Sequence, residues 1–197
     1  MLSYLNDPEV KVKYTQRFAA HRKADEVIQG TGFDNGRGCF VGCTLDAYEH
    51  ERFPIELGWP QWLAHLADSI FEGVPKVEAA QFGTDLLEAV PVGVDLEPVR
   101  ARFLLTVQRR NLARMEANTN PEAPAVRDAI RGVISFLEKE EAAESAAESA
   151  AWSAAWSAAW SAAESAAESA ARLAAWSDEY KTMRDDLLAI CRELGTV

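Results

Sequence analysis

The stretch between Gly132 and Gly195 contains neither glycine nor proline, and this constrains the fold more than any other feature of the sequence. Its middle part, residues 142–171, repeats the tetrapeptide Ala-Ala-x-Ser, and alanine has the highest helix propensity of all residues. A continuous helix here would be about 90 Å long, whereas a globule built from the preceding residues would be only about 30 Å across. We therefore expect the helix to project, to fold back as a hairpin or to pair with copies of itself.

The period of four residues is longer than one helical turn. Each repeat advances the chain by about 400°, so equivalent residues drift by about 40° around the helix. The fixed seam of a coiled coil needs a period of 3.5 residues, and we therefore do not expect the tract to form an ordinary coiled coil. Its three tryptophans instead form one compact patch, and a track of alanines lies on another side of the helix.

A patch of three tryptophans on a helix usually marks an interface, because each ring can bury roughly 200 Å². We expect self-association, or docking of a protein partner, through the tryptophan patch and the alanine track. Two alternatives stay open: the rings are covered within the chain, or the tract is a repeat expansion without a role. The predicted interface residues are Trp152, Trp156, Trp160, Trp176, Ala151, Ala155, Ala158 and Ala162.

Helix signals also dominate the residues that precede this stretch, where apolar–polar alternation typical of a strand does not persist. Asp7 and Pro8 are a helix cap and a first-turn proline, and they predict a helix from there to Gly30. Residues 31–43 contain four of the eleven glycines and are expected to form a loop. Further helices are predicted at residues 60–73, 77–90 and 95–115.

The predicted fold class is all-α. A helical globular domain is expected at residues 1–118, and a long C-terminal helix or helical hairpin, which associates with itself or with a partner, at residues 119–197. The chain of 197 residues is long enough for one such domain with its own core and an appendage.

The formal net charge of −11 argues against a nucleic-acid-binding protein, which needs a cationic face for phosphates. The sequence has no run of about 20 apolar residues that would cross a membrane, and its N-terminal residues lack the basic and apolar regions of a signal peptide. We therefore expect a cytoplasmic protein whose three cysteines are reduced thiols.

The residues that could carry chemistry are cysteines, histidines and one aspartate in the N-terminal half. His21 and Asp25 lie four residues apart on the apolar side of the first predicted helix. Cys39, Cys43 and His50 follow in the segment GRGCFVGCTLDAYEH.

Three interpretations of these residues stay open. His21, Cys39, Cys43 and His50 could complete a tetrahedral zinc site, although their spacing is unlike that of compact zinc knuckles. Alternatively, one cysteine could act as a nucleophile with a histidine as base and Asp25 as the orienting carboxylate, provided that a helix beginning just after Cys43 lowers the pKa of the thiol. The favoured interpretation is that both cysteines are small buried core residues.

Three phrases in the N-terminal part resemble an uncharacterised family of bacterial and phage-associated proteins: GCFVGCTL, ELGWPQWLAHLADSIFEGVP and AVPVGVD. The resemblance covers about residues 1–118, and the Ala/Ser/Trp repeat looks like a variable extension. The resemblance implies a bacterial or viral origin. It implies no activity, cofactor or site residue.

Together these features favour a non-enzymatic, oligomerising interaction or scaffold protein. A phage or bacterial regulator or inhibitor that binds a host protein is one form of this class. The alternative is a small Cys/His-dependent enzyme or zinc-binding protein centred on the five residues His21, Asp25, Cys39, Cys43 and His50.

Overall fold

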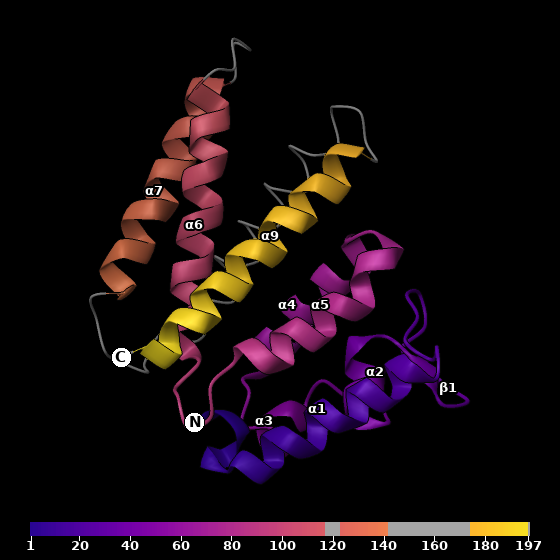
Figure 1. The fold of residues 1–197 in the computed structure, drawn as a ribbon. Coiled ribbons are helices and arrows are strands. Elements are labelled where there is room, and N and C mark those ends of the chain that lie inside the picture. Colours follow the sequence, from indigo (N-terminus) through magenta and orange to yellow (C-terminus); the bar gives the residue numbers. More distant parts are fainter. Residues whose placement is uncertain (117–122, 142–173, 197) are drawn as a thin grey trace. The chain divides into compact units, whose positions relative to one another are not determined.

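The computed structural model describes residues 1–116, 123–141 and 174–196 (Figure 1). The described residues are predominantly helical with one two-stranded sheet, which confirms the all-α prediction. The helices are α1 (Pro8–Lys23), α2 (Phe40–Leu45), α3 (Arg52–Glu56), α4 (Gln61–Gly73), α5 (Lys76–Ala89), α6 (Glu97–Glu116), α7 (Ala123–Glu141) and α9 (Ala174–Glu193). The short elements are the 3-10 turns η1 (Ser3–Asn6) and η2 (Leu194–Thr196) and the strands β1 (Phe33–Asp34) and β2 (Arg37–Gly38).

The chain forms two compact units. Unit 1 consists of Met1–Val99 together with Ser177–Val197, and unit 2 consists of Arg100–Trp176. These bounds differ from the predicted domains 1–118 and 119–197. They differ because the apolar side of α9 belongs to the core of unit 1, so that the C-terminal residues return to the N-terminal ones.

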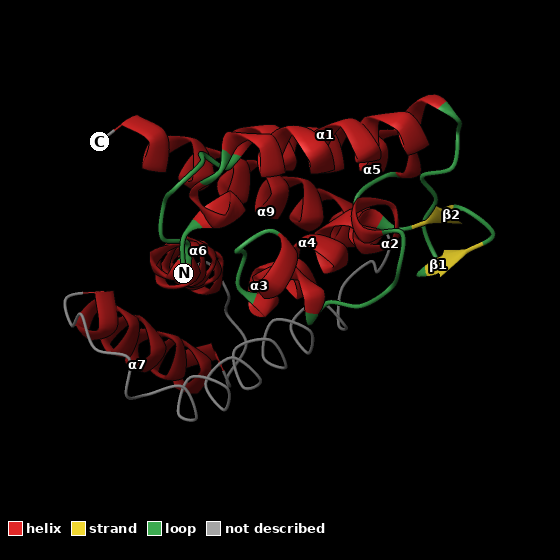
Figure 2. Cartoon of the chain, turned by 90° about the horizontal axis from the view of Figure 1, so that it is seen from below, coloured by secondary structure: helices red, strands yellow, loops and turns green. Residues whose placement is uncertain are grey.

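Aromatic rings from several helices meet in the core of unit 1. Phe40 at the start of α2 is fully buried, and its ring centroid lies 5.8 Å from Phe18 of α1, 6.0 Å from Phe53 of α3 and 6.5 Å from Phe82 of α5. The helix α5 packs against both α1 and α4, and α2 packs against α1 and α4 (Figure 2). Burial of these large rings stabilises unit 1.

The first helix begins as predicted but ends early. The Asp7 side chain accepts a hydrogen bond of 2.8 Å from the backbone N–H of Glu9, which confirms the cap. The helix ends at Lys23, and not at Gly30, because the backbone turns at Asp25, which has a φ of 58°. Beyond the turn, the N–H of Ile28 donates to the carbonyl of Gly38, so residues after Asp25 pair with the β-hairpin instead of continuing the helix.

The glycine-rich residues 31–43 are only partly a loop. They contain the hairpin of β1 and β2, in which Phe33 pairs with Gly38, and the beginning of α2 (Figure 2). The sequence predicts a loop because glycine disfavours regular structure, but Gly38 and Gly42 are needed in the hairpin and in α2 because of a close backbone approach. A Cβ atom at either position would overlap the carbonyl oxygen of Gly32.

Helix α9 completes unit 1. Leu187 and Cys191 are fully buried, and the aromatic ring of Tyr180 lies where a Cβ on Gly73 of α4 would be. Arg184 of α9 forms an ion pair with Glu78 of α5. The apolar side of α9 therefore continues the core that α4 and α5 begin.

In unit 2, α6 and α7 share a small apolar cluster. Leu104 and Leu105 of α6 are buried together with Leu137 of α7, and Arg109 forms a 2.9 Å ion pair with Glu138 beside them. Within the described residues, no helix has the length and apolarity needed to span a bilayer.

Candidate functional site

A polar cluster in unit 1 is centred on Asp68 of α4, which is only 7% exposed. Its Oδ2 atom accepts a hydrogen bond of 3.1 Å from the hydroxyl of Tyr48 and lies 3.4 Å from Nε2 of His50. Its Oδ1 atom is buried and has no hydrogen-bond partner among the described residues. One oxygen of this buried carboxylate therefore has two polar neighbours, whereas the other lacks a geometrically good hydrogen bond from any described residue.

Two further ligand-type side chains lie next to Asp68. The thiol sulfur of Cys39, a carboxylate oxygen of Asp68 and a carboxylate oxygen of Glu72 lie within 4.8 Å of one another. Asp68 and Glu72 are four residues apart on α4 and so share one side of the helix. Cys39 precedes the first residue of α2, and its N–H donates to the carbonyl of Thr31 at 2.9 Å.

Glu72 is fixed from the opposite side by the chain that leaves α1. Its Oε2 atom accepts a hydrogen bond of 2.8 Å from the N–H of Gly30. The neighbouring Gln29 donates through its side-chain amide to the carbonyl of Phe71, at 2.6 Å, and to that of Val74, at 2.9 Å. These bonds satisfy carbonyl groups at the end of α4, where intrahelical partners are missing. They also bring residues 29–30 to the rim of the cluster.

The electrostatics of the cluster are those of converging acidic groups. Burial alone would raise the pKa of the Asp68 carboxyl, but His50, Cys39 and Tyr48 outweigh burial and lower it. Burial and the negative charge of Asp68 raise the pKa of the Cys39 thiol far above its usual value. The same two causes raise the pKa of Glu72, against the hydrogen bond from Gly30. Burial and the Asp68 carboxylate together therefore favour the protonated forms of Cys39 and Glu72.

Two histidine rings border the cluster. The ring of His50 stacks on that of His65, with centroids 4.0 Å apart and an interplanar angle of 14°. Burial, followed by the charge of His50, lowers the pKa of His65. Burial and the charge of Asp68 raise the pKa of Tyr48 to about 12, which keeps its hydroxyl a hydrogen-bond donor at neutral pH.

The structure does not bring the five predicted chemical residues together. His21 lies at a separate place, where Nδ1 is 2.7 Å from Oε2 of Glu26 and Nε2 is 2.7 Å from Oδ1 of Asp46. Asp25 is not the partner of His21, because the chain turns at this residue and presents Glu26 instead. In the described residues, the predicted zinc set of His21, Cys39, Cys43 and His50 does not form a group of converging ligands.

The two cysteines also differ from the predicted nucleophile. Helix α2 begins at Phe40, so Cys43 lies inside this helix and not ahead of one. The Cys43 thiol donates to the carbonyl of Gly38 at 3.3 Å, and burial raises its pKa to about 12. Both Cys39 and Cys43 are buried, as the core interpretation expected. Thiols with raised pKa values are poor nucleophiles at neutral pH.

Sequence reasoning missed Asp68, Glu72 and His65, although they lie within the phrase ELGWPQWLAHLADSIFEGVP. Their spacing of three and then four residues places them on one side of a helix whose other side is apolar. This spacing was a usable signal. The pairing of Asp68 with Cys39 and His50 cannot be predicted from the sequence, because it depends on how α4 packs against the segment around α2.

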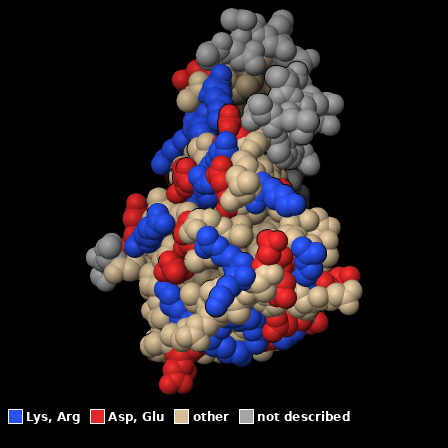
Figure 3. All heavy atoms as spheres, turned by 45° about the vertical axis from the view of Figure 1, so that its right-hand side comes forward, with Lys and Arg blue, Asp and Glu red and all other residues tan. Residues whose placement is uncertain are grey.

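The predicted interface residues of the repeat, Trp152, Trp156, Trp160, Ala151, Ala155, Ala158 and Ala162, lie outside the described residues, as does the side chain of Trp176. On the face of the described residues drawn in Figure 3, basic and acidic side chains alternate over short distances without a continuous cationic stripe. A mixed surface of this kind is typical of a solvated protein face.

No family model matches the sequence, and no curated protein or solved structure is significantly similar to it. The resemblance to an uncharacterised bacterial and phage-associated family therefore stays a prediction.

Proposed function

We propose that this protein is a non-enzymatic interaction protein that presents the segment 100–176 from unit 1 and associates through the Ala-Ala-x-Ser tract within it. The observation that carries the proposal is the composition of unit 1, which contains the residues on both sides of this segment. The tract is thus part of an insertion into unit 1 and not a terminal tail. An insertion is attached at two points, which restricts its conformations and lowers the entropic cost of ordering it in an interface.

The C-terminal attachment is built from specific contacts. Leu187 and Cys191 of α9 are fully buried in unit 1, and Arg184 pairs with Glu78. A repeat without a role needs no such attachment at its far end. These contacts therefore favour the interface interpretation of the tryptophan patch over passive expansion.

The enzyme alternative has less support from the described residues. Of its two proposed bases, His21 is engaged by two carboxylates, and His50 lies 3.4 Å from Oδ2 of Asp68. Within the described part of the chain, neither histidine forms a hydrogen bond with Cys39 or Cys43. Both thiols have raised pKa values because of burial. Association needs none of these residues.

Two finer statements belong to the same proposal. The first is that the partner is a second copy of the chain. A protein that also binds a bacterial host protein, as a regulator or inhibitor, would belong to the same class of interaction proteins. The location is the cytoplasm, which fits the three free cysteines, Cys39, Cys43 and Cys191, that form no disulfide.

The test compares the solution mass of the unaltered chain with that of a triple variant, Trp152→Ala, Trp156→Ala and Trp160→Ala, by sedimentation velocity. The matched control replaces Ser153, Ser157 and Ser161 by alanine, which changes the same three repeats and keeps helix propensity high. We expect the unaltered chain and the serine variant to sediment as oligomers and the tryptophan variant as a smaller species. Equal masses for the tryptophan variant and the unaltered chain would contradict the proposal.

A further inference from the structure

We propose that Cys39, Asp68 and Glu72 bind a divalent zinc ion. This site is independent of the proposed association, because all three residues belong to unit 1 and none lies in the inserted segment. It also differs from the zinc set expected from the sequence, since it shares only Cys39 with that set.

The three ligand atoms lie near enough to one another for small side-chain movements to bring them to one zinc ion. Zinc binds thiolate sulfur at about 2.3 Å and carboxylate oxygen at about 2.1 Å, so neighbouring ligands of a tetrahedral ion are roughly 3.5 Å apart. The sulfur of Cys39 and the oxygens of Asp68 and Glu72 lie within 4.8 Å of one another. Small changes in the side-chain torsion angles of Glu72, which is exposed, can supply the remaining closure while Oε2 keeps its hydrogen bond from Gly30.

One oxygen of each carboxylate has a partner outside the three proposed ligands. Tyr48 and His50 hold Oδ2 of Asp68, and the N–H of Gly30 holds Oε2 of Glu72. Oδ1 of Asp68 is buried without a hydrogen-bond partner among the described residues. A buried carboxylate oxygen with no donor is costly in free energy, and a cation beside it removes that cost. Partners that orient a ligand in this way are a general feature of metal sites.

The charges of the site also favour a cation. Three groups that can carry negative charge converge there. A divalent ion offsets the repulsion among their ionised forms. When the ion binds, the Cys39 thiol loses its proton to solvent and the sulfur–metal bond takes its place.

The ligand set selects the metal and the geometry. Thiolate is a soft ligand that disfavours magnesium and calcium, which prefer oxygen alone. Cys39 and Asp68 are buried, whereas Glu72 is exposed. The ion can therefore enter from the side of Glu72, and water occupies the fourth position there.

The test uses the full chain, treated with chelator and titrated at fixed pH with Zn²⁺ in a calorimeter and with Co²⁺ in a spectrophotometer. We expect one ion per chain and, with Co²⁺, the absorption band of a thiolate–cobalt bond. The Cys39→Ser substitution should abolish the band, and Asp68→Asn and Glu72→Gln should each weaken Zn²⁺ binding at least about tenfold, because even the loss of an orienting partner costs 10- to 100-fold. Cys43→Ser is the matched control, a buried cysteine four residues further on, and should leave binding unchanged.

A second measurement keeps the proposal testable if a variant does not fold. In the unaltered chain, Zn²⁺ should slow alkylation of Cys39 in the folded protein, as followed by peptide mass spectrometry, and should leave the rate at Cys43 unchanged. Absence of a thiolate–cobalt band in the unaltered chain, or Zn²⁺ binding that survives Cys39→Ser, would overturn the site and would show that the cluster only organises α4. Neither result affects the proposed association.

Discussion

Arg184 in α9 forms an ion pair with Glu78 in α5, and this contact joins residues separated by the whole inserted segment. Arg184 also reaches Asp185 at 2.8 Å, and the two acidic partners raise the pKa of its guanidinium against burial. With Leu187 and Cys191 in the core, the pair attaches the C-terminal helix to unit 1.

This attachment predicts that α9 contributes to the stability of unit 1. Replacing the fully buried Leu187 by alanine should lower the free energy of unfolding by about 3 kcal/mol, because it leaves a cavity in the core. Replacing Lys181, whose amino group pairs with Asp178 on the same helix at 3.2 Å, should change the free energy of unfolding by less than about 0.5 kcal/mol. Urea denaturation measures both. Equal effects of the two substitutions would show that α9 is not part of the core.

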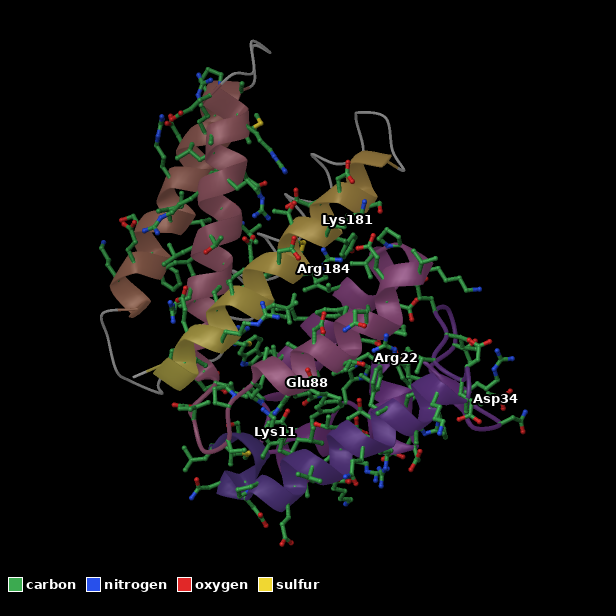
Figure 4. The ribbon with its side chains drawn as sticks, in the orientation of Figure 1. Lys11, Arg22, Asp34, Glu88, Lys181 and Arg184 are labelled. Atoms are coloured by element: carbon green, nitrogen blue, oxygen red, sulfur yellow. The ribbon has the colours of Figure 1, made fainter. Side chains whose placement is uncertain are left out.

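Lys11 of α1 caps the C-terminal end of α5, and Figure 4 shows it directed toward Glu88. Its Nζ donates to the backbone carbonyls of Glu88, at 2.8 Å, and of Val90, at 2.6 Å. The Lys11→Met substitution keeps most of the apolar stem but removes the donor, and should lower the free energy of unfolding by about 2 kcal/mol. Lys23→Met, at the exposed end of the same helix, is the control and should be nearly neutral. Comparable losses for both variants would argue against a capping role.

His21 predicts a pH dependence of stability with a defined sign. Burial disfavours its charged form, but Asp46 and Glu26 outweigh burial and raise its pKa above the ordinary value of 6.5. The folded protein therefore holds the proton more tightly than the unfolded chain does. The resulting stabilisation is fully present below the unfolded pKa and is lost as the pH rises through the folded pKa.

Chemical denaturation between pH 5 and pH 9 checks this prediction. The difference in stability between the unaltered chain and His21→Gln should be largest at the acid end and should shrink as the pH rises. His65 provides the opposite case, because burial and the charge of His50 lower its pKa. Its contribution to the free energy of unfolding should therefore be lost as the pH falls. A difference for His21→Gln that grows with pH would contradict the assigned contacts.

The backbone conformation of the N-terminal turn η1 predicts an unusual amino-acid preference at the position of Leu5. Tyr4, Leu5 and Asn6 all have φ values between 52° and 58°, a left-handed conformation that costs roughly 1–2 kcal/mol per residue. The turn persists because Tyr4 is fully buried and its hydroxyl donates to the carbonyl of Leu87 at 2.6 Å. Leu5 itself is 48% exposed, so its side chain contributes little.

Substitution at Leu5 should therefore follow backbone preference and not hydrophobicity. Leu5→Ile keeps the apolar surface but adds a β-branch, and should lower the free energy of unfolding by about 1 kcal/mol. Leu5→Asn removes apolar surface but suits the left-handed region, and should be at least as stable as the unaltered chain. Thermal unfolding ranks the variants. A more stable isoleucine variant would show that the left-handed turn is absent in solution.

The parts of the fold that the sequence predicted well are those governed by local signals. Asp95 and Asp7 accept hydrogen bonds from N–H groups two residues further on, as a cap must, and the helices after them begin where expected. The helix predicted after Pro60 ends at Gly73, as expected. These signals act between neighbouring residues, so no knowledge of packing was needed.

The parts that the sequence did not predict depend on distant contacts. The helix α1 ends at Lys23 because Ile28 pairs with Gly38, and the polar cluster forms because Asp68 meets Cys39 and His50. The predicted group of residues around His21 does not form for the same reason. A position on one side of a helix does not determine which loop packs against that side. The return of α9 to unit 1 likewise has no local signal.

The central claim is that the chain associates through the inserted repeat, and the solution mass of the unaltered chain over a dilution series tests it most directly. Sedimentation equilibrium should give a mass above that of one 21.7 kDa chain at high concentration, falling toward it on dilution. Tryptophan emission should shift to longer wavelength over the same range, as rings in the interface become exposed to water. A single-chain mass and an unchanged emission at every concentration would contradict the account.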